Sequence, residues 1–360
     1  MNDAHAVSNK VLYGYVVVFI LFIFSYLEQF ISGARYIKYL VPVFVLFFYV
    51  LDVVRTRELY FVRSRPAYPF VFLVFYGLFL SIFYGESDLR DLYFLLTAFA
   101  PLLFLGTVPL LYIDIAAKVL AVLYLIEFSM FGSVGEISFI DSKSSYEGTI
   151  SFLFGFFVLW YSVRRKWIFS LLFFVLLLLS LKRIALIGVV LGGGYLLMFR
   201  AGRDLRYIEK VIYIIPIFAL VFSLAFSLGL ISYVLEDYFG VSIGYLTMGR
   251  SFISAYVYEA IAGNGMVWFG YGPGVVYEYV SEATDAITIN LHNDYLKIFL
   301  EYGVFGFLVF FALFARAVQG VGVVFYIYLS CLFLTDNCLI YPQVLFFILA
   351  AIDAEGNDCE

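Results

Sequence analysis

The chain has 360 residues, of which 64% are apolar, 21% are aromatic and only 14% are charged. Soluble globular domains are about half apolar and about one quarter charged, so this composition excludes a soluble enzyme and a disordered chain. A net charge of −5 also argues against a nucleic-acid-binding protein, because such a protein needs a surplus of Lys and Arg. The composition therefore predicts an all-α polytopic membrane protein.

Hydropathy predicts about twelve transmembrane helices in one integral membrane domain that comprises residues 1–360. A helix needs about 20 apolar residues to cross the roughly 30 Å of hydrocarbon in a bilayer. We expect the first apolar run to be retained as a span, because no cleavage site with small residues follows it. The predicted spans are residues 11–30, 37–54, 67–84, 92–112, 119–134, 148–163, 167–181, 184–199, 211–230, 295–314, 318–334 and 338–352.

The distribution of positive charge predicts the orientation of these spans. Three connections carry clusters of Lys and Arg, at residues 55–65, 164–166 and 200–210. Cytoplasmic loops of membrane proteins are enriched in Lys and Arg, so we assign all three clusters to the cytoplasm. Passing the predicted spans through these assignments leaves both termini in the cytoplasm.

The stretch between two of these clusters, residues 167–199, must cross the membrane and return. The turn is therefore predicted at residues 180–183, which read Ser-Leu-Lys-Arg. From Lys166 to Lys182 a helix would extend about 24 Å, which is short of the roughly 30 Å hydrocarbon core. We therefore expect Lys182 and Arg183 to lie at, or slightly below, the outer membrane surface, at the depth of a lipid pyrophosphate.

Residues 231–294 form the one long connection, which we assign to the outer face as a large extracytoplasmic loop. A loop of this length among tight connections is usually functional. It contains a single cation, Arg250, among seven acidic residues, and near its end lies His292, the only histidine beyond the N-terminal tail. The run GYGPG at residues 270–274 predicts a turn.

Histidine and arginine suit the two halves of a group-transfer reaction. An imidazole can take a proton from a sugar hydroxyl near neutral pH. The planar guanidinium of Arg pairs with phosphate through two hydrogen bonds and can offset the charge of a departing pyrophosphate. Because His292 directly precedes the predicted span 295–314, this chemistry would take place at the outer membrane surface.

Three sequence runs resemble those of a known family. They are HNDYLKIFLEYGVFG at 292–306, GYGPG at 270–274 with Gly249-Arg250 before it, and SLKRIALIG at 180–188. Together they are similar to the O-antigen ligases and Wzy-type O-antigen polymerases, over roughly residues 170–315. The resemblance implies a GT-C-like, inverting and metal-independent glycosyltransferase without a cofactor. It also implies a place in the bacterial cytoplasmic membrane, with the active site facing the periplasm.

The same resemblance implies the substrates and partners. The donor would be an oligosaccharide on undecaprenyl pyrophosphate, held in the lipid bilayer. A chain-length regulator and a flippase would act alongside the enzyme, and no nucleic acid takes part.

Roles for four residues also follow from the resemblance. Arg183, with help from Lys182, would bind the donor pyrophosphate. Arg250 would bind or neutralise the same group from the loop. His292 would act as the base for the acceptor hydroxyl, or would orient it.

Four more residues are candidates for supporting roles. Asn293 and Asp294 are typical helix-capping residues at the start of a predicted span. Glu301 lies inside that span, where an acid requires a partner or a water-filled cavity. Lys297 or Arg35 could replace further loop arginines that other members of the family show.

Each main candidate also has a purely structural interpretation. The cations of the turn at 180–183 could be interfacial side chains of a hairpin. Arg250 could pair with Glu236 or Asp237 and fix the loop. The ring of His292 could hydrogen-bond a backbone carbonyl at the start of a helix.

Three functions are compatible with these features. The first is a polysaccharide polymerase that transfers the growing glycan to the terminal sugar of another lipid-linked repeat unit. The second is a ligase that transfers finished polymer to lipid A core or to a protein. The third is a flippase or exporter of lipid-linked oligosaccharide, which would place ionisable residues along a path through the membrane centre.

Overall fold

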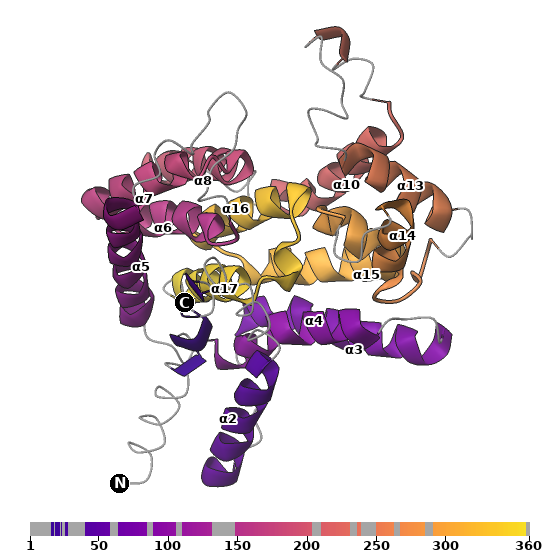
Figure 1. Cartoon of the computed structure of the whole chain (residues 1–360), viewed down its shortest axis with the longest axis horizontal. Helices are drawn as coiled ribbons and strands as arrows, with labels where there is room; N and C mark the ends of the chain where they lie inside the picture. Colours follow the sequence, from indigo (N-terminus) through magenta and orange to yellow (C-terminus); the bar gives the residue numbers. More distant parts are fainter. Residues whose placement is uncertain are drawn as a thin grey trace.

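The structure of the protein is a computed structural model, in which every element of the described residues is a helix (Figure 1). It describes residues 40–57, 64–84, 89–105, 110–131, 148–203, 210–230, 236–238, 250–262, 267–284 and 291–357, with separate positions between 16 and 27. The elements are α2 (Val41–Thr56), η2 (Arg65–Ala67), α3 (Tyr68–Tyr84), α4 (Leu89–Phe99), η3 (Ala100–Phe104), α5 (Leu110–Phe131), α6 (Ser151–Val163), α7 (Trp167–Leu179), α8 (Arg183–Arg200), α10 (Ile215–Ser227), α13 (Arg250–Ala262), α14 (Val275–Thr284), α15 (Asp294–Ala317), α16 (Gly322–Thr335), η5 (Cys338–Ile340) and α17 (Pro342–Asn357).

Most predicted spans coincide with helices, but the division between two of them is wrong. The predicted spans 92–112 and 119–134 are replaced by α4, the short 3₁₀ helix η3 and one long helix, α5. α5 continues through the predicted connection because Asp114 and Lys118 form an ion pair of 2.8 Å one helical turn apart. Paired in this way, the two charges are compatible with a continuous helix.

The number of spans stays a prediction. Three helices are long and apolar enough to cross a membrane: Arg65–Phe83, Arg183–Arg200 and Asp294–Ala317. Five other apolar helices of the described residues have 10–17 residues; α6 and α7, for example, have 13 each, or about 20 Å. The predicted span 338–352 begins with η5 and becomes α-helical at the start of α17, and the predicted span 11–30 lies largely outside the described residues.

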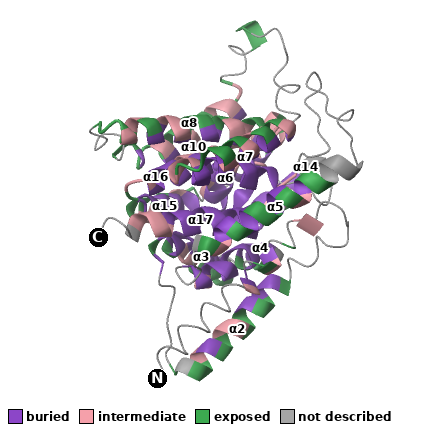
Figure 2. Cartoon of the chain, turned by 90° about the vertical axis from the view of Figure 1, so that its left-hand side faces the viewer, coloured by how far each residue is buried: buried purple, intermediate pink, exposed green. Residues whose placement is uncertain are grey.

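Exposed residues run along the outer helices of the bundle (Figure 2), and many of them are large and apolar. Ile82 on α3, Ile168 on α7 and Phe218 on α10 are 79%, 84% and 74% exposed. Such a surface is unfavourable in water and favourable in hydrocarbon, so the protein is a membrane protein. At its centre lies α17, which contacts α4, α6 and α16; every residue from Gln343 to Leu349 has an exposed fraction of 0%.

The helix that follows His292, α15, is interrupted at Gly303, where the sequence predicted a continuous span. Gly303 has φ 68° and ψ −177°, a conformation that is essentially restricted to glycine. The backbone N–H groups of Val304 and Phe305 donate to the carbonyls of Val267 and Trp268, at 2.9 and 3.0 Å. The segment before α14 thus supplies the hydrogen bonds that the interrupted helix cannot make itself.

The interruption depends on a close contact between two glycine backbones. A Cβ atom on Gly303 would lie 2.5 Å from the nitrogen of Gly270, and one on Gly270 would lie 2.3 Å from the carbonyl oxygen of Glu301. Gly272 donates its N–H to the same Glu301 carbonyl at 2.8 Å. The predicted turn at 270–274 is therefore confirmed, and it is fixed directly to α15.

Replacing Gly303 by Ala should lower the free energy of unfolding by about 3 kcal/mol or more, because Ala adds backbone strain and a collision with Gly270. The matched control is Gly193→Ala on α8, where a Cβ would meet nothing within 4 Å. That change should leave stability unchanged or slightly raised, since Ala favours a helix. Denaturant unfolding of the purified protein in detergent would measure both, and equal midpoints for the two variants would contradict the role of the interruption.

Candidate functional site

A cavity of about 340 Å³ lies where α8, α10, α13, the start of α15 and the end of α16 meet. Four residues that the sequence singled out line it together: Lys182, Arg183, Arg250 and His292. They come from three separate parts of the chain. Apolar side chains of α8 and α10 form another part of the wall, namely Ile184, Ile187, Phe222 and Phe226.

The turn that carries the first two cations lies where the sequence predicts it. α7 ends at Leu179 and α8 begins at Arg183, so the hairpin at residues 180–183 is confirmed. Leu181 within this turn has φ 54°, an uncommon value for a residue other than glycine. The tight turn brings the start of α8 to the cavity.

Three helices begin at this cavity. Arg183 is the first residue of α8, Arg250 is the first residue of α13, and Asn293 is the N-cap of α15. The start of a helix exposes unpaired backbone N–H groups and carries partial positive charge. Lys182, the N-cap of α8, makes no side-chain hydrogen bond to its helix. Together with the two guanidinium groups, this arrangement suits an anion such as a pyrophosphate.

The two arginines differ in how they are held. Arg183 is exposed, and within the described part of the chain its guanidinium makes no hydrogen bond or ion pair. Arg250 donates from Nη1 to the backbone carbonyl of Thr335, at 3.0 Å, at the end of α16. This contact, rather than an ion pair with Glu236 or Asp237, fixes Arg250 at the cavity. Both guanidinium groups retain N–H donors for a ligand.

His292 is held by its backbone and by one ring nitrogen. It has φ 54°, and its N–H donates to Oδ1 of Asn337 at 3.1 Å. Its ring Nδ1 lies 3.4 Å from Nδ2 of Asn337 and 3.8 Å from Oδ1 of Asp336. Because these groups face Nδ1, the other ring nitrogen, Nε2, is the one left for a ligand. Among the described residues, no hydrogen-bond partner occupies it.

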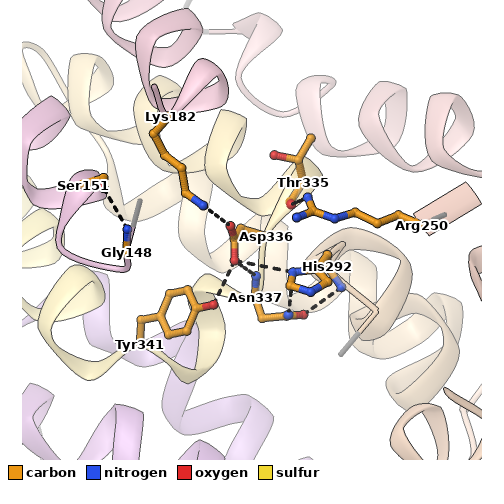
Figure 3. A network of polar contacts seen from close by, with 9 residues as sticks. All are labelled: Gly148, Ser151, Lys182, Arg250, His292, Thr335, Asp336, Asn337 and Tyr341. Carbon is orange, nitrogen blue, oxygen red and sulfur yellow. Dashed lines mark hydrogen bonds and ion pairs between the residues drawn. The ribbon is translucent and has the colours of Figure 1, made fainter. Parts of the chain in front are cut away.

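Sequence reasoning missed Asp336, which joins the two halves of the cavity (Figure 3). Its carboxylate lies 3.8 Å from Nζ of Lys182 and accepts hydrogen bonds from the hydroxyl of Tyr341 and its neighbour's N–H, both at 2.9 Å. Burial acts to raise the pKa of Asp336, but the nearby ring of His292 and the charge of Lys182 outweigh it and hold this pKa below its ordinary value. Asp336 is therefore a carboxylate that faces both Lys182 and His292.

A signal for Asp336 and Asn337 was present in the sequence. The two polar residues stand between two apolar runs, the predicted spans 318–334 and 338–352. In the predicted topology this short connection lies on the same side of the membrane as His292. Polar residues in a short connection are common, however, and nothing local indicates that they contact a residue more than 40 positions away.

The two residues after His292 have different roles. Asn293 caps α15 as predicted, since its Oδ1 accepts from the N–H of Leu296 at 2.9 Å, and its amide also donates to Ser223 on α10. Asp294 does not cap its own helix. It is fully buried, and its Oδ2 accepts from the N–H of Leu339 in η5 at 3.1 Å. Both residues thus position the start of α15.

Lys297 and Glu301 do not line the cavity. Nζ of Lys297 lies 2.6 Å from Asp91 of α4 and 3.6 Å from Glu301, and all three side chains are buried. Glu301 also accepts from the N–H of Gly274 at 3.1 Å. The three side chains therefore join α4, α15 and the turn at 270–274, away from the residues that line the cavity. Arg35, the alternative to Lys297, lies outside the described residues.

The described residues offer no grouped metal ligands. No set of three or more His, Cys, Asp or Glu side chains lies together in that part of the chain. His292 and Asp336 are two such residues, whereas a catalytic zinc ion usually takes three protein ligands. The metal-free and cofactor-free reaction that the resemblance implies stays a prediction.

Comparison with known proteins gives one match. Residues 168–311 match the family model described as O-Antigen ligase. The match extends from α7 into α15, so it contains the four cavity residues that the sequence singled out, and it ends before Asp336. No curated protein and no solved structure matches the chain. The resemblance drawn from the three sequence runs is therefore confirmed.

Replacing Asp336 by Asn should lower the free energy of unfolding by about 1–3 kcal/mol at pH 7, because Lys182 and His292 lose a charged partner. Since the folded-state pKa of Asp336 lies below its ordinary 3.8, the carboxylate contributes stability above that value. The contribution is lost as pH falls through the folded-state pKa. The difference between the variant and the native protein should therefore shrink between pH 7 and pH 3.

The control for this experiment is Asp237→Asn, which removes the same charge at an exposed position. Denaturant unfolding at the two pH values gives the difference for each variant. If Asp336→Asn changed stability equally at both pH values, the carboxylate would not be the group that holds the network.

Proposed function

We propose that this chain, whose residues 168–311 match the O-Antigen ligase family model, is a membrane glycosyltransferase that polymerises lipid-linked repeat units. The observation that carries the proposal is the shared cavity, at which two arginines and one histidine from separate elements meet. A pyrophosphate leaving group requires cations, and an acceptor hydroxyl requires a base. The cavity offers both within one space.

The donor is an oligosaccharide on undecaprenyl pyrophosphate. Its pyrophosphate binds between Arg183 and Arg250, at the N-termini of α8 and α13, with Lys182 beside them. Ile187 and Phe222 line the same cavity and are 51% and 45% exposed. These apolar side chains support a path along α8 and α10 by which the polyprenyl chain leaves the site for the surrounding lipid.

The reaction transfers the glycan in one displacement. Nε2 of His292 takes the proton of the acceptor hydroxyl while that oxygen attacks the anomeric carbon of the donor sugar. The bond between this carbon and the pyrophosphate oxygen breaks, and its electron pair leaves with the diphosphate, whose charge Arg183 and Arg250 offset. Attack from the face opposite the leaving group inverts the anomeric carbon. Asp336 and Asn337 keep the imidazole in position.

The distribution of charge supports a site at the outer face of the bacterial cytoplasmic membrane, with both termini inside. Residues 164–166 and 200–203, which belong to two of the positive clusters, flank the α7–α8 hairpin at its open end, opposite the turn at 180–183. If the clusters are cytoplasmic, the turn faces the periplasm. At about 20 Å, α7 is shorter than the hydrocarbon core, which supports a turn slightly below the outer surface.

A ligase is the second candidate, because the family model that matches is described as O-Antigen ligase. Polymerase and ligase share the donor and differ in the acceptor, so the product distinguishes them. Purified protein in liposomes would be given lipid-pyrophosphate-linked repeat units, with and without lipid A core. Lipid-linked oligomers made without core support the polymerase, and product made only with core supports the ligase. Movement of the substrate across the bilayer without a new glycosidic bond would contradict both.

Replacing His292 by Asn should reduce transfer by a factor of about 100 to 10,000, because Asn tolerates the left-handed backbone conformation but cannot act as a base. His5→Ala, which removes the chain's other histidine, is the control and should retain activity. Initial rates of oligomer formation at saturating donor measure the effect. Normal transfer by a correctly folded His292→Asn protein would remove the assignment of the base.

Replacing Arg183 by Ala should reduce transfer by a factor of about 100 or more, because the cation offsets charge on the leaving pyrophosphate. Arg183→Lys should recover only part of this loss, since an ammonium lacks the planar pair of donors. Arg203→Ala, at an exposed position beyond the opposite end of α8, should behave as the native protein. Equal rates for the Ala and Lys variants of Arg183 would argue against bidentate binding of the diphosphate.

A further inference from the structure

Part of the cavity wall beside His292 consists of serines, which are neither cationic nor apolar. Ser223 and Ser227 of α10 and Ser254 of α13 line the cavity, and their exposed fractions are 3%, 6% and 7%. α10 contacts α13, so the serines belong to two helices that lie side by side (Figure 1). A hydroxyl group carries no charge, so these residues do not offset the charge of a diphosphate.

The two serines of α10 already use their hydroxyl protons. Oγ of Ser223 donates to the carbonyl of Ala219 at 2.7 Å, and Oγ of Ser227 donates to the carbonyl of Ser223 at 2.8 Å. A serine inside a helix commonly bonds the carbonyl one turn earlier in this way. Oγ of Ser223 also accepts from the amide of Asn293 at 2.8 Å. Ser227 is therefore left with an oxygen at the cavity wall that can accept a hydrogen bond.

Ser254 differs from the serines of α10. Although this residue is buried, its hydroxyl makes no hydrogen bond to the described residues, and it does not use the carbonyl of Arg250 one turn earlier. Burial of a hydroxyl without a partner is unfavourable unless a ligand supplies one. This hydroxyl can both donate and accept. Ser254 therefore indicates a place in the cavity for a polar, uncharged group of a ligand.

The spacing along α13 relates this place to the cations. Ser254 follows Arg250, the first residue of α13, by one helical turn, which is about 6 Å along the helix axis. Both residues line the cavity, so a group bonded directly to a phosphate at Arg250 reaches Ser254. In a lipid-linked oligosaccharide that group is the first sugar. Its hydroxyls donate and accept hydrogen bonds, as the serine hydroxyl does.

We propose that Ser254 and Ser227 bind the first sugar of the donor, the one bonded to the pyrophosphate. This assignment rests on the proposed function, because it takes Arg183 and Arg250 as the binding site of the pyrophosphate. A hydroxyl or amide N–H of the sugar donates to Oγ of Ser227, and a further polar group of the sugar pairs with the hydroxyl of Ser254. A sugar that lacks these groups leaves the serine hydroxyls unpaired, so the two residues also select the donor.

Close packing of helices is the purely structural explanation for these serines. Small residues let two membrane helices approach each other, whether or not they bind a sugar. Replacement by Ala, which is also small and favours a helix, keeps that role and removes the hydroxyl. Ala variants therefore separate sugar binding from packing.

The test measures the binding of undecaprenyl pyrophosphate, either bare or bearing one glucose, galactose or N-acetylglucosamine, to the purified full chain in lipid nanodiscs. The native protein should bind at least one sugar-bearing carrier more tightly than the bare carrier. Ser254→Ala should weaken the binding of that carrier by a factor of about 3 to 10, because one hydrogen bond to the sugar is lost. Ser227→Ala/Ser254→Ala should weaken it further. Both variants should bind the bare carrier as the native protein does.

Two further variants serve as references. Ser81→Ala on α3 is the matched control, because the hydroxyl of Ser81 also donates to its own helix, at 2.8 Å from the carbonyl oxygen of Gly77, and Ser81 does not line the cavity. It should bind every carrier as the native protein does. Arg183→Ala should weaken the binding of the bare and the sugar-bearing carriers alike, because it acts on the pyrophosphate.

The outcomes separate this assignment from the proposed function. If the native protein bound the bare carrier and every sugar-bearing carrier equally, the sugar site would be overturned while the pyrophosphate site remained. A preference for a sugar that the double serine variant retained in full would also overturn it, because other residues would then bind the sugar. If Arg183→Ala bound the bare carrier as the native protein does, the proposed function would fail, and the sugar site with it.

Discussion

The packing of α15 against the segment at 267–272 depends on one requirement: every backbone polar group inside a membrane needs a hydrogen-bond partner. Taken alone, α15 does not meet this requirement at Gly303, where two N–H groups have no partner within the helix. The segment at 267–272 supplies carbonyl acceptors for these N–H groups. This arrangement brings two glycine backbones into close contact. Because these hydrogen bonds join this segment to α15, they fix the helix half that begins beside His292.

Charges inside the bundle fall into two groups with different consequences. Lys297, Asp91 and Glu301 are buried against one another, and the pairing of the one ammonium with the two acids lowers the cost of burying them in an apolar bundle. Arg183 and His292 instead face a cavity, and each retains hydrogen-bonding groups that the described residues do not satisfy. The first group stabilises the packing of the helices, and the second is available for a ligand.

The cavity combines a polar end with an apolar wall because of where its helices end. Helix starts supply N–H groups and cations, whereas the sides of α8 and α10 supply the aliphatic and aromatic surface of membrane helices. A lipid with a diphosphate headgroup has the same division into a charged and an apolar part. Leu181 and His292, both with positive φ, lie at the polar end, where the chain turns sharply to enter a helix.

The sequence by itself determined the class of protein, the hairpin turn at 180–183 and the identity of the main cavity residues. Apolar run length and the position of charges are governed by transfer from water to hydrocarbon, which acts residue by residue and can be read locally. Arg250 and His292 stood out because a long loop contains one cation and one histidine. The family resemblance then joined them to Arg183, without showing that they meet.

Only the tertiary structure decided that these residues share a cavity, and that Asp336 and Asn337 hold the histidine. It also decided that Lys297 and Glu301 pair with Asp91, and that Asp114 lies within a continuous helix because Lys118 neutralises it. The conformation of Gly303 could not be predicted from the sequence either, since a glycine in an apolar run is compatible with a straight helix. In each case the deciding energy comes from a partner supplied by another part of the fold, and a local sequence pattern contains no information about that partner.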